Sequence, residues 1–239
     1  MSAPREPVRL SKQVAAMVPC SRSEAEQYII GGWVRVNGKV VEEPQARVTD
    51  ERIELDPAAS LDALEPVTLL LHKPAGLGEA GARRLLLPAN HWPDDPAGIR
   101  TVKKHFVHLD GLMELPAPAS GLAVFTQDHR IVRKLEEDAR LIEQELLAEV
   151  AGEIAPNGLA RLCHGLVYDH QPLPPARVSW QSEHRLRFAV KGIPPWLLPW
   201  MVEQVGLRLV ALRRLRIGRV PMAQLAPGQW RYLQPGEKF

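Results

Sequence analysis

The stretch that decides the N-terminal fold reads CSRSEAEQYIIGGWVRVNG, residues 20–38. Ser21 followed three residues later by Glu24 is a capping box, in which each side chain satisfies a free backbone amide at the start of a helix. Gly31-Gly32 predicts the end of that helix, because glycine tolerates the left-handed backbone that closes a helical turn. These residues therefore predict one short, capped helix.

A β-hairpin is predicted directly after this helix. Residues 33–36 alternate in character as a strand does, Asn37-Gly38 is a favoured pair for a tight turn, and residues 39–41 return. Upstream, apolar side chains recur at helical spacing and predict another helix: Leu10, Val14 and Met17. Residues 9–56 thus predict two helices and a hairpin.

The remainder of the chain predicts a larger domain of strands and helices in irregular order. Apolar strands are expected at Val67–His72 and Gly121–Thr126, and a helix at about 196–205. We therefore expect an α+β protein with a small N-terminal unit at 1–57, a linker at 58–66, and a mixed, largely antiparallel domain at 67–239.

Composition narrows the class of protein. No apolar run is long enough to span a bilayer, and the first ten residues lack the core of a signal peptide, so we expect a cytoplasmic protein without a membrane contact. Cys20 and Cys163 are the only cysteines and suit a reducing compartment. The sequence offers no metal-ligand cluster. The run RLVALRRLRIGR (208–219) is either a solvated strand face or a surface for phosphate oxygens.

The first segment resembles the RNA-binding S4 domain, named after the fourth protein of the small ribosomal subunit. Four matches carry the resemblance: RLSK (9–12), CSRSEAE (20–26), GGWVRVNG (31–38) and IELD (53–56). It implies binding to structured RNA. The RNA-facing positions it implies are Arg9, Lys12, Ser21, Arg22, Arg35, Asn37 and Lys39.

The rest of the chain resembles the bacterial ribosomal-RNA pseudouridine synthases of the RsuA type. The matching segments are VTLLLHKPAG (67–76), SGLAVFTQD (120–128), IEQELLAEV (142–150), ALRRLRIG (211–218) and LAPGQWRYL (225–233). The resemblance implies isomerisation of uridine in ribosomal RNA, without metal or cofactor. Lys73 and the arginines of the basic strand, Arg213, Arg214 and Arg216, are further expected RNA contacts.

Three catalytic positions depart from that family. The aspartate expected five residues before Gly121 is Pro116, which has no ionisable group. The tyrosine position is Leu146, and residues 193–201, where the family has a basic helix, contain no Lys or Arg. Asp110 is a substitute candidate, but it lies six residues too early for a carboxylate that must be placed within about 1 Å.

Three hypotheses follow. The first is an RNA-binding homologue without isomerase activity, whose cleft is closed by residues 193–201 packing toward Leu115 and Leu146. This hypothesis expects Trp196, Leu197, Leu198 and Trp200 in the closing surface. The second is an active synthase with a displaced carboxylate. The third is an adaptor in ribosome assembly that holds a protein partner with residues 193–201.

Overall fold

The computed structural model describes residues 6–239, which form two compact units. The first unit contains the described residues up to Pro66 together with Ile99–Val107, and the second contains Val67–Gly98 and His108–Phe239. The sequence predicts that all of 67–239 belongs to the second domain. The structure instead groups Ile99–Val107 with the first unit. We call Ile99–Val107 the crossing segment.

The first unit has the predicted helices and hairpin. Its elements are β1 (Val8–Arg9), α1 (Leu10–Met17), α2 (Arg22–Ile30), β2 (Val34–Val36), β3 (Lys39–Val40), β4 (Arg47–Val48) and β5 (Ile53–Leu55). The capping box of Ser21 and Glu24 is present in both directions. Asn37 and Gly38 have φ of 49° and 79°, which the tight turn requires. The predicted helix cap and hairpin are therefore confirmed.

The crossing segment completes this unit through several kinds of contact. The Arg100 guanidinium lies 3.8 Å from the Trp33 ring centroid and donates to the Gly32 carbonyl and the Asp56 carboxylate. Val102 is buried, and the space beside Gly32 that a side chain would take is occupied by Val102. Burial of this valine explains why the segment groups with the first unit.

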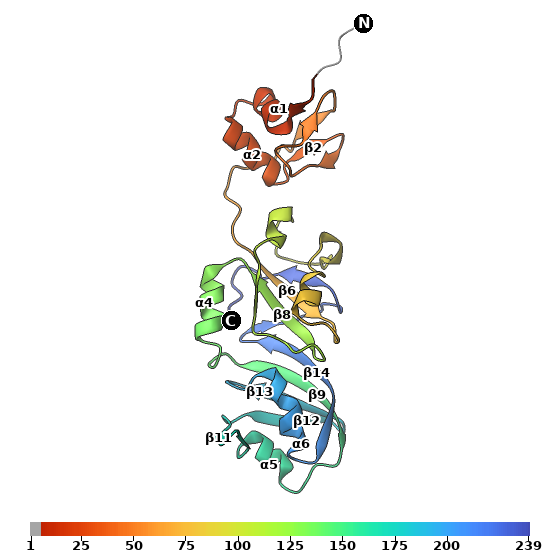
Figure 1. Ribbon diagram of the computed structural model, residues 1–239, viewed down its shortest axis with the longest axis vertical. Helices are drawn as coiled ribbons and strands as arrows, with labels where there is room; N and C mark the ends of the chain where they lie inside the picture. Colours follow the sequence, from red (N-terminus) through yellow and green to blue (C-terminus); the bar gives the residue numbers. More distant parts are fainter. Residues whose placement is uncertain (1–5) are drawn as a thin grey trace. The chain divides into compact units, whose positions relative to one another are not determined.

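The second unit is built on a nine-stranded sheet whose central order is β12-β13-β9-β14-β8-β6-β16 (Figure 1). Strands β14 and β8 pair in parallel, and the other strand pairs of this sheet in the described chain are antiparallel. The α+β, largely antiparallel prediction is confirmed. The strands are β6 (Thr68–Lys73), β7 (Asp110–Leu112), β8 (Ser120–Thr126), β9 (Gln144–Gly152), β12 (Arg177–Ser182), β13 (Arg185–Val190), β14 (Leu207–Ile217), β15 (Val220–Pro221) and β16 (Trp230–Tyr232), with a separate hairpin of β10 (Val167–Tyr168) and β11 (Gln171–Pro172).

Short helices cover one face of the strands β12, β13, β9 and β14. Residues of α5 (Gly158–Cys163) and α6 (Leu198–Glu203) join this face in one apolar cluster, which includes Leu162 and Leu198. The expected helix at 196–205 is shorter: a 3₁₀ turn at Pro195–Leu197 precedes α6. The remaining helices are α3 (Glu79–Arg83) and α4 (His129–Glu137), with 3₁₀ turns at Pro88–Asn90 and Lys103–Phe106. None of the helices within residues 6–239 is both long and apolar enough to cross a bilayer.

Candidate functional site

The loop at residues 113–119, between β7 and β8, occupies the place where the resemblance implies a catalytic carboxylate. The ammonium of Lys73, at the end of β6, holds this loop by donating to the carbonyls of Ala117 (3.3 Å) and Ala119 (2.6 Å). The same ammonium donates to the Leu77 carbonyl at 2.7 Å. Burial, and secondarily the charge of Arg214, lower the pKa of Lys73. This lysine therefore has a structural role, because its hydrogens serve main-chain oxygens.

A glycine is required where β8 meets β14. Gly121 has φ of +113°, and a β-carbon there would lie 2.2 Å from the Arg214 carbonyl oxygen. The Arg214 side chain is buried and donates to the carbonyls of Leu122 (2.8 Å) and Met113 (2.7 Å). Burial lowers the pKa of Arg214 to about 9, so the guanidinium is still charged at neutral pH. Among the described residues, no carboxylate forms an ion pair with it.

The Arg214 guanidinium also determines how Gln144 is oriented. Its Nη1 donates to the Gln144 Oε1 at 2.9 Å. Because a guanidinium can only donate, it selects the amide oxygen of Gln144, and the amide nitrogen faces the other way. Gln144 is buried and lines a pocket, so this nitrogen supplies a hydrogen-bond donor on the pocket wall.

The positions at which the resemblance expects catalytic residues lie in or beside an apolar interior. Pro116 is half-buried and its carbonyl accepts from the Ala119 amide, closing a turn. Leu115 and Leu146 are buried in one apolar cluster with Leu197. Proline offers no group that can act as a nucleophile or a base, and leucine offers none that can contact a base by hydrogen bonding.

The proposed closure by residues 193–201 is confirmed in part. Leu197 and Leu198 are buried in the same cluster as Leu115 and Leu146, and Trp200 packs against it. Trp196 was expected in this closing surface, but 56% of it is exposed. Its ring contacts Tyr168, a residue at the edge of the cluster, with ring centroids 6.0 Å apart.

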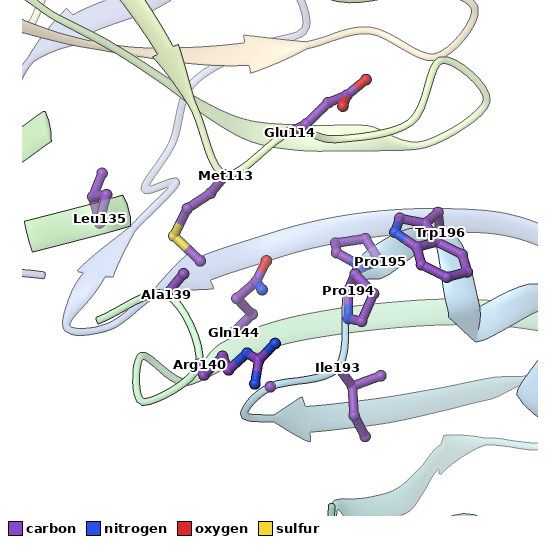
Figure 2. A pocket seen from close by; sticks show the side chains of 11 residues that line it. Met113, Glu114, Leu135, Ala139, Arg140, Gln144, Ile193, Pro194, Pro195 and Trp196 are labelled. Carbon is purple, nitrogen blue, oxygen red and sulfur yellow. The ribbon is translucent and has the colours of Figure 1, made fainter. Parts of the chain in front are cut away.

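A pocket of about 430 Å³ remains open beside Trp196 (Figure 2). Apolar side chains form most of its wall, and Gln144 and Arg140 add polar groups. Glu114 contributes to the rim, but its carboxylate points away from Gln144 in Figure 2. Pro116 does not line this pocket. The pocket can accept a flat ring of moderate size, and Gln144 can donate to it.

Asp110 is far from the loop that would need its carboxylate. It lies in β7 and pairs with Thr126, at the opposite end of β8 from Ser120. Six residues of extended strand separate these two positions, which corresponds to about 20 Å. Asp110 is therefore not placed to supply the carboxylate that the resemblance expects at position 116.

The predicted RNA-facing residues of the first unit are exposed. They are Arg9, Lys12, Ser21, Arg22, Arg35, Asn37 and Lys39. Several also have local partners: Arg22 pairs with Glu26 (3.4 Å), and the Asn37 amide oxygen accepts from the Arg52 amide (2.9 Å). Exposure makes these side chains accessible to a ligand.

The four predicted RNA contacts of the second unit have different environments. Lys73 and Arg214 are buried and bonded internally, so they are not accessible to RNA, contrary to the prediction. Arg216 pairs with Glu143 (2.6 Å) and Glu145 (3.2 Å). Arg213 alone of the four is exposed, because side chains alternate between the faces of β14.

Sequence reasoning missed Gln144, Arg140 and Met113 as parts of a pocket. A signal for Gln144 was present, because it stands two residues before Leu146 in a strand and therefore shares its face. No comparable signal exists for Arg140 or Met113, which belong to irregular segments.

Comparison with known proteins agrees with this architecture. A family model described as the S4 domain matches residues 8–52. The chain is 25% identical to an uncharacterized RNA pseudouridine synthase of Aquifex aeolicus, over 96% of this chain and 94% of the relative. It is 27% identical to ribosomal large subunit pseudouridine synthase B of Bacillus subtilis, over 96% and 93%. A crystal structure of pseudouridylate synthase superposes with a TM-score of 0.59 at 20% identity, covering 95% of this chain and 96% of the other.

Proposed function

Because the chain is a homologue of the pseudouridine synthases that carries an S4 domain and has their fold, we propose that it binds structured ribosomal RNA in the cytoplasm without isomerising uridine. The S4 unit supports the first part of this proposal through its exposed basic side chains. The free cysteines Cys20 and Cys163 suit a reducing compartment.

The observation that carries the proposal is the chemistry of the loop at 113–119. Pseudouridine formation requires a carboxylate at the sugar of an extruded nucleotide. Pro116 stands at that position, while Glu114 points away from Gln144 and Asp110 lies at the other end of β8. The buried cations Lys73 and Arg214 serve carbonyl and amide oxygens instead of a carboxylate.

The open pocket supports retention of RNA without chemistry. An unpaired base can stack on the exposed indole of Trp196, and a carbonyl or ring nitrogen of the base can accept from the Gln144 amide. Arg140 at the pocket wall can then face a phosphate. Stacking of a base on an aromatic side chain contributes about 1–3 kcal/mol, so Trp196→Ala should weaken binding to an RNA loop by about 5- to 150-fold.

The proposal is tested by incubating the purified chain with ribosomal RNA carrying tritium at carbon five of uridine. Isomerisation releases this hydrogen, so no release is expected. The Bacillus subtilis relative provides the matched positive control. Tritium release by the unmodified chain would overturn the proposal and favour an active synthase. In that case Glu114→Gln and Asp110→Ala would identify the carboxylate, because the required variant would lose turnover while the other kept it.

A protein partner at residues 193–201 is the remaining alternative. Most apolar side chains of this segment are buried, among them Leu197, Leu198 and Met201, which leaves Trp196 as its main exposed apolar group. The surface offered to a protein is therefore small. We prefer an RNA base as the occupant, because the pocket also supplies the Gln144 donor.

A further inference from the structure

The second face of the β12-β13-β9-β14 region carries several arginines. Leu186 and Phe188 are buried in the apolar cluster on the first face, so Arg185 and Arg187 of the same strand point to the second. By the same alternation, Leu212 is buried and its neighbour Arg213 is exposed. Arg177 also lies on this second face, because its neighbour Val178 is buried in the cluster on the first. Arg177, Arg185, Arg187 and Arg213 are all exposed to solvent.

Three of these arginines are not neutralised by a carboxylate in the described part of the chain. Arg187 pairs with Glu145 at 2.7 Å, which neutralises it. Within residues 6–239, no ion pair joins Arg177, Arg185 or Arg213 to a carboxylate. Glu149 is an exposed acidic residue on the same face, opposite Arg185 in the strand register. The net charge of the face is therefore positive.

A recess of about 110 Å³ lies between two of the arginines. Arg185 and Arg213 line it from β13 and β14, the strands on either side of β9, and Ser120 adds a hydroxyl from β8. Arg185 is opposite Glu149 and Arg213 is opposite Leu147. Two strand spacings and this two-residue offset place the arginine backbones about 12 Å apart, and side chains of this length can converge on one group between them. Glu149 also lines the recess, so two guanidinium groups and one carboxylate face this space.

We propose that this arginine face binds the phosphate backbone of RNA, separately from the S4 unit, with one phosphate group seated between Arg185 and Arg213. This inference rests on the proposed function and adds a second surface to it. Guanidinium groups donate in pairs to phosphate oxygens, and the Ser120 hydroxyl can donate a further hydrogen bond. Two guanidinium groups and one hydroxyl line the recess, and such donors suit a contact to the phosphate backbone.

The experiment measures affinity for a fluorescein-labelled ribosomal RNA stem-loop at several potassium chloride concentrations. The double variant Arg185→Glu and Arg213→Glu tests the face, and Arg84→Glu with Arg133→Glu is the matched control on exposed arginines elsewhere in the second unit. Loss of this one phosphate contact should reduce the slope of log affinity against log salt by about 0.7–0.9. We expect at least about tenfold weaker binding at low salt, and no such change in the control.

A third arm separates this inference from the proposed function. Lys12→Ala with Arg22→Ala weakens the S4 unit. If that variant loses RNA and the Arg185/Arg213 variant keeps the wild-type slope, the arginine face is refuted and RNA binding by the S4 unit remains. Wild-type affinity in both variants refutes the S4 surface as well. If the wild type binds polyglutamate and only the face variant loses that binding, with RNA affinity unchanged, the face takes an acidic protein and the RNA assignment is overturned.

Discussion

Arg100 joins the crossing segment to the S4 unit, so its removal tests whether that segment stabilises the unit. Arg100→Ala removes stacking on Trp33 at 3.8 Å, a bond to the Gly32 carbonyl at 3.2 Å and an ion pair with Asp56 at 3.1 Å. Val102 and the backbone of the segment remain. The variant therefore measures the polar part of the contact only.

The expected magnitude follows from these three interactions. A partly exposed cation–π contact contributes about 0.5–1 kcal/mol, and a hydrogen bond contributes about 0.5–1.5 kcal/mol. The ion pair with Asp56 is exposed and screened by solvent, so it adds little to these two contributions. Because one guanidinium makes all three contacts, they are not independent, and we expect a loss of about 1–3 kcal/mol.

Hydrogen exchange monitored by mass spectrometry is the appropriate assay, because it reports each unit separately. Peptides covering β2 and β5 should exchange about 5- to 150-fold faster in Arg100→Ala, whereas β9 in the second unit should not change. Arg133→Ala, an exposed arginine of α4, serves as the control. A second readout is Asp56, whose pKa is lowered first by the Ala58 amide and then by Arg100. Its pKa should rise part of the way in the variant.

Unchanged exchange in β2 and β5 would refute the reasoning. The crossing segment would then rest on the S4 unit without stabilising it. A uniform increase across both units would also contradict the prediction, because it would indicate a general loss of stability.

Three further predictions concern the second unit. Pro116→Asp alone should not produce tritium release from labelled ribosomal RNA, because the new carboxylate would have no basic partner from residues 193–201; turnover by this variant would contradict it. Leu198→Ala truncates a core side chain and should lower the free energy of unfolding, measured by urea denaturation, by about 2–5 kcal/mol. Trp196→Ala should lower it by less than about 0.5 kcal/mol. Equal losses in the two variants would show that our assignment of burial is wrong. Arg216 is the main cause of the lowered pKa of Glu143. Their ion pair therefore stabilises the fold fully at pH values above the unfolded carboxyl pKa of about 4.3. This stabilisation disappears as the pH falls through the lower pKa of the folded state. The stability difference between wild type and Arg216→Gln should therefore shrink below about pH 4, and a difference independent of pH would argue against it.

The sequence was sufficient to predict the S4 unit and to find proline at the position where the resemblance expects an aspartate. Ser21 and Glu24 satisfy backbone amides within one helical turn, and Asn37-Gly38 adopts the positive φ of a tight turn. The helix cap and the turn can therefore be predicted from residues that are close in sequence. Pro116 was located by counting from Gly121, which is fixed in place because the backbone of Arg214 leaves no room for a side chain. A missing carboxylate is visible in sequence because proline cannot ionise in any fold.

Tertiary structure decided which basic residues are accessible and which segments belong together. Arg213 and Arg214 are neighbours in sequence, yet Arg213 is exposed and Arg214 is buried against Gln144. Side chains alternate between the two faces of a strand, and only the tertiary structure shows which face is covered. The crossing segment joined the first unit through Val102 and Arg100, which contact residues about 45–70 positions away. Such contacts depend on the burial and charge of distant side chains, and no local pattern in a single sequence encodes them.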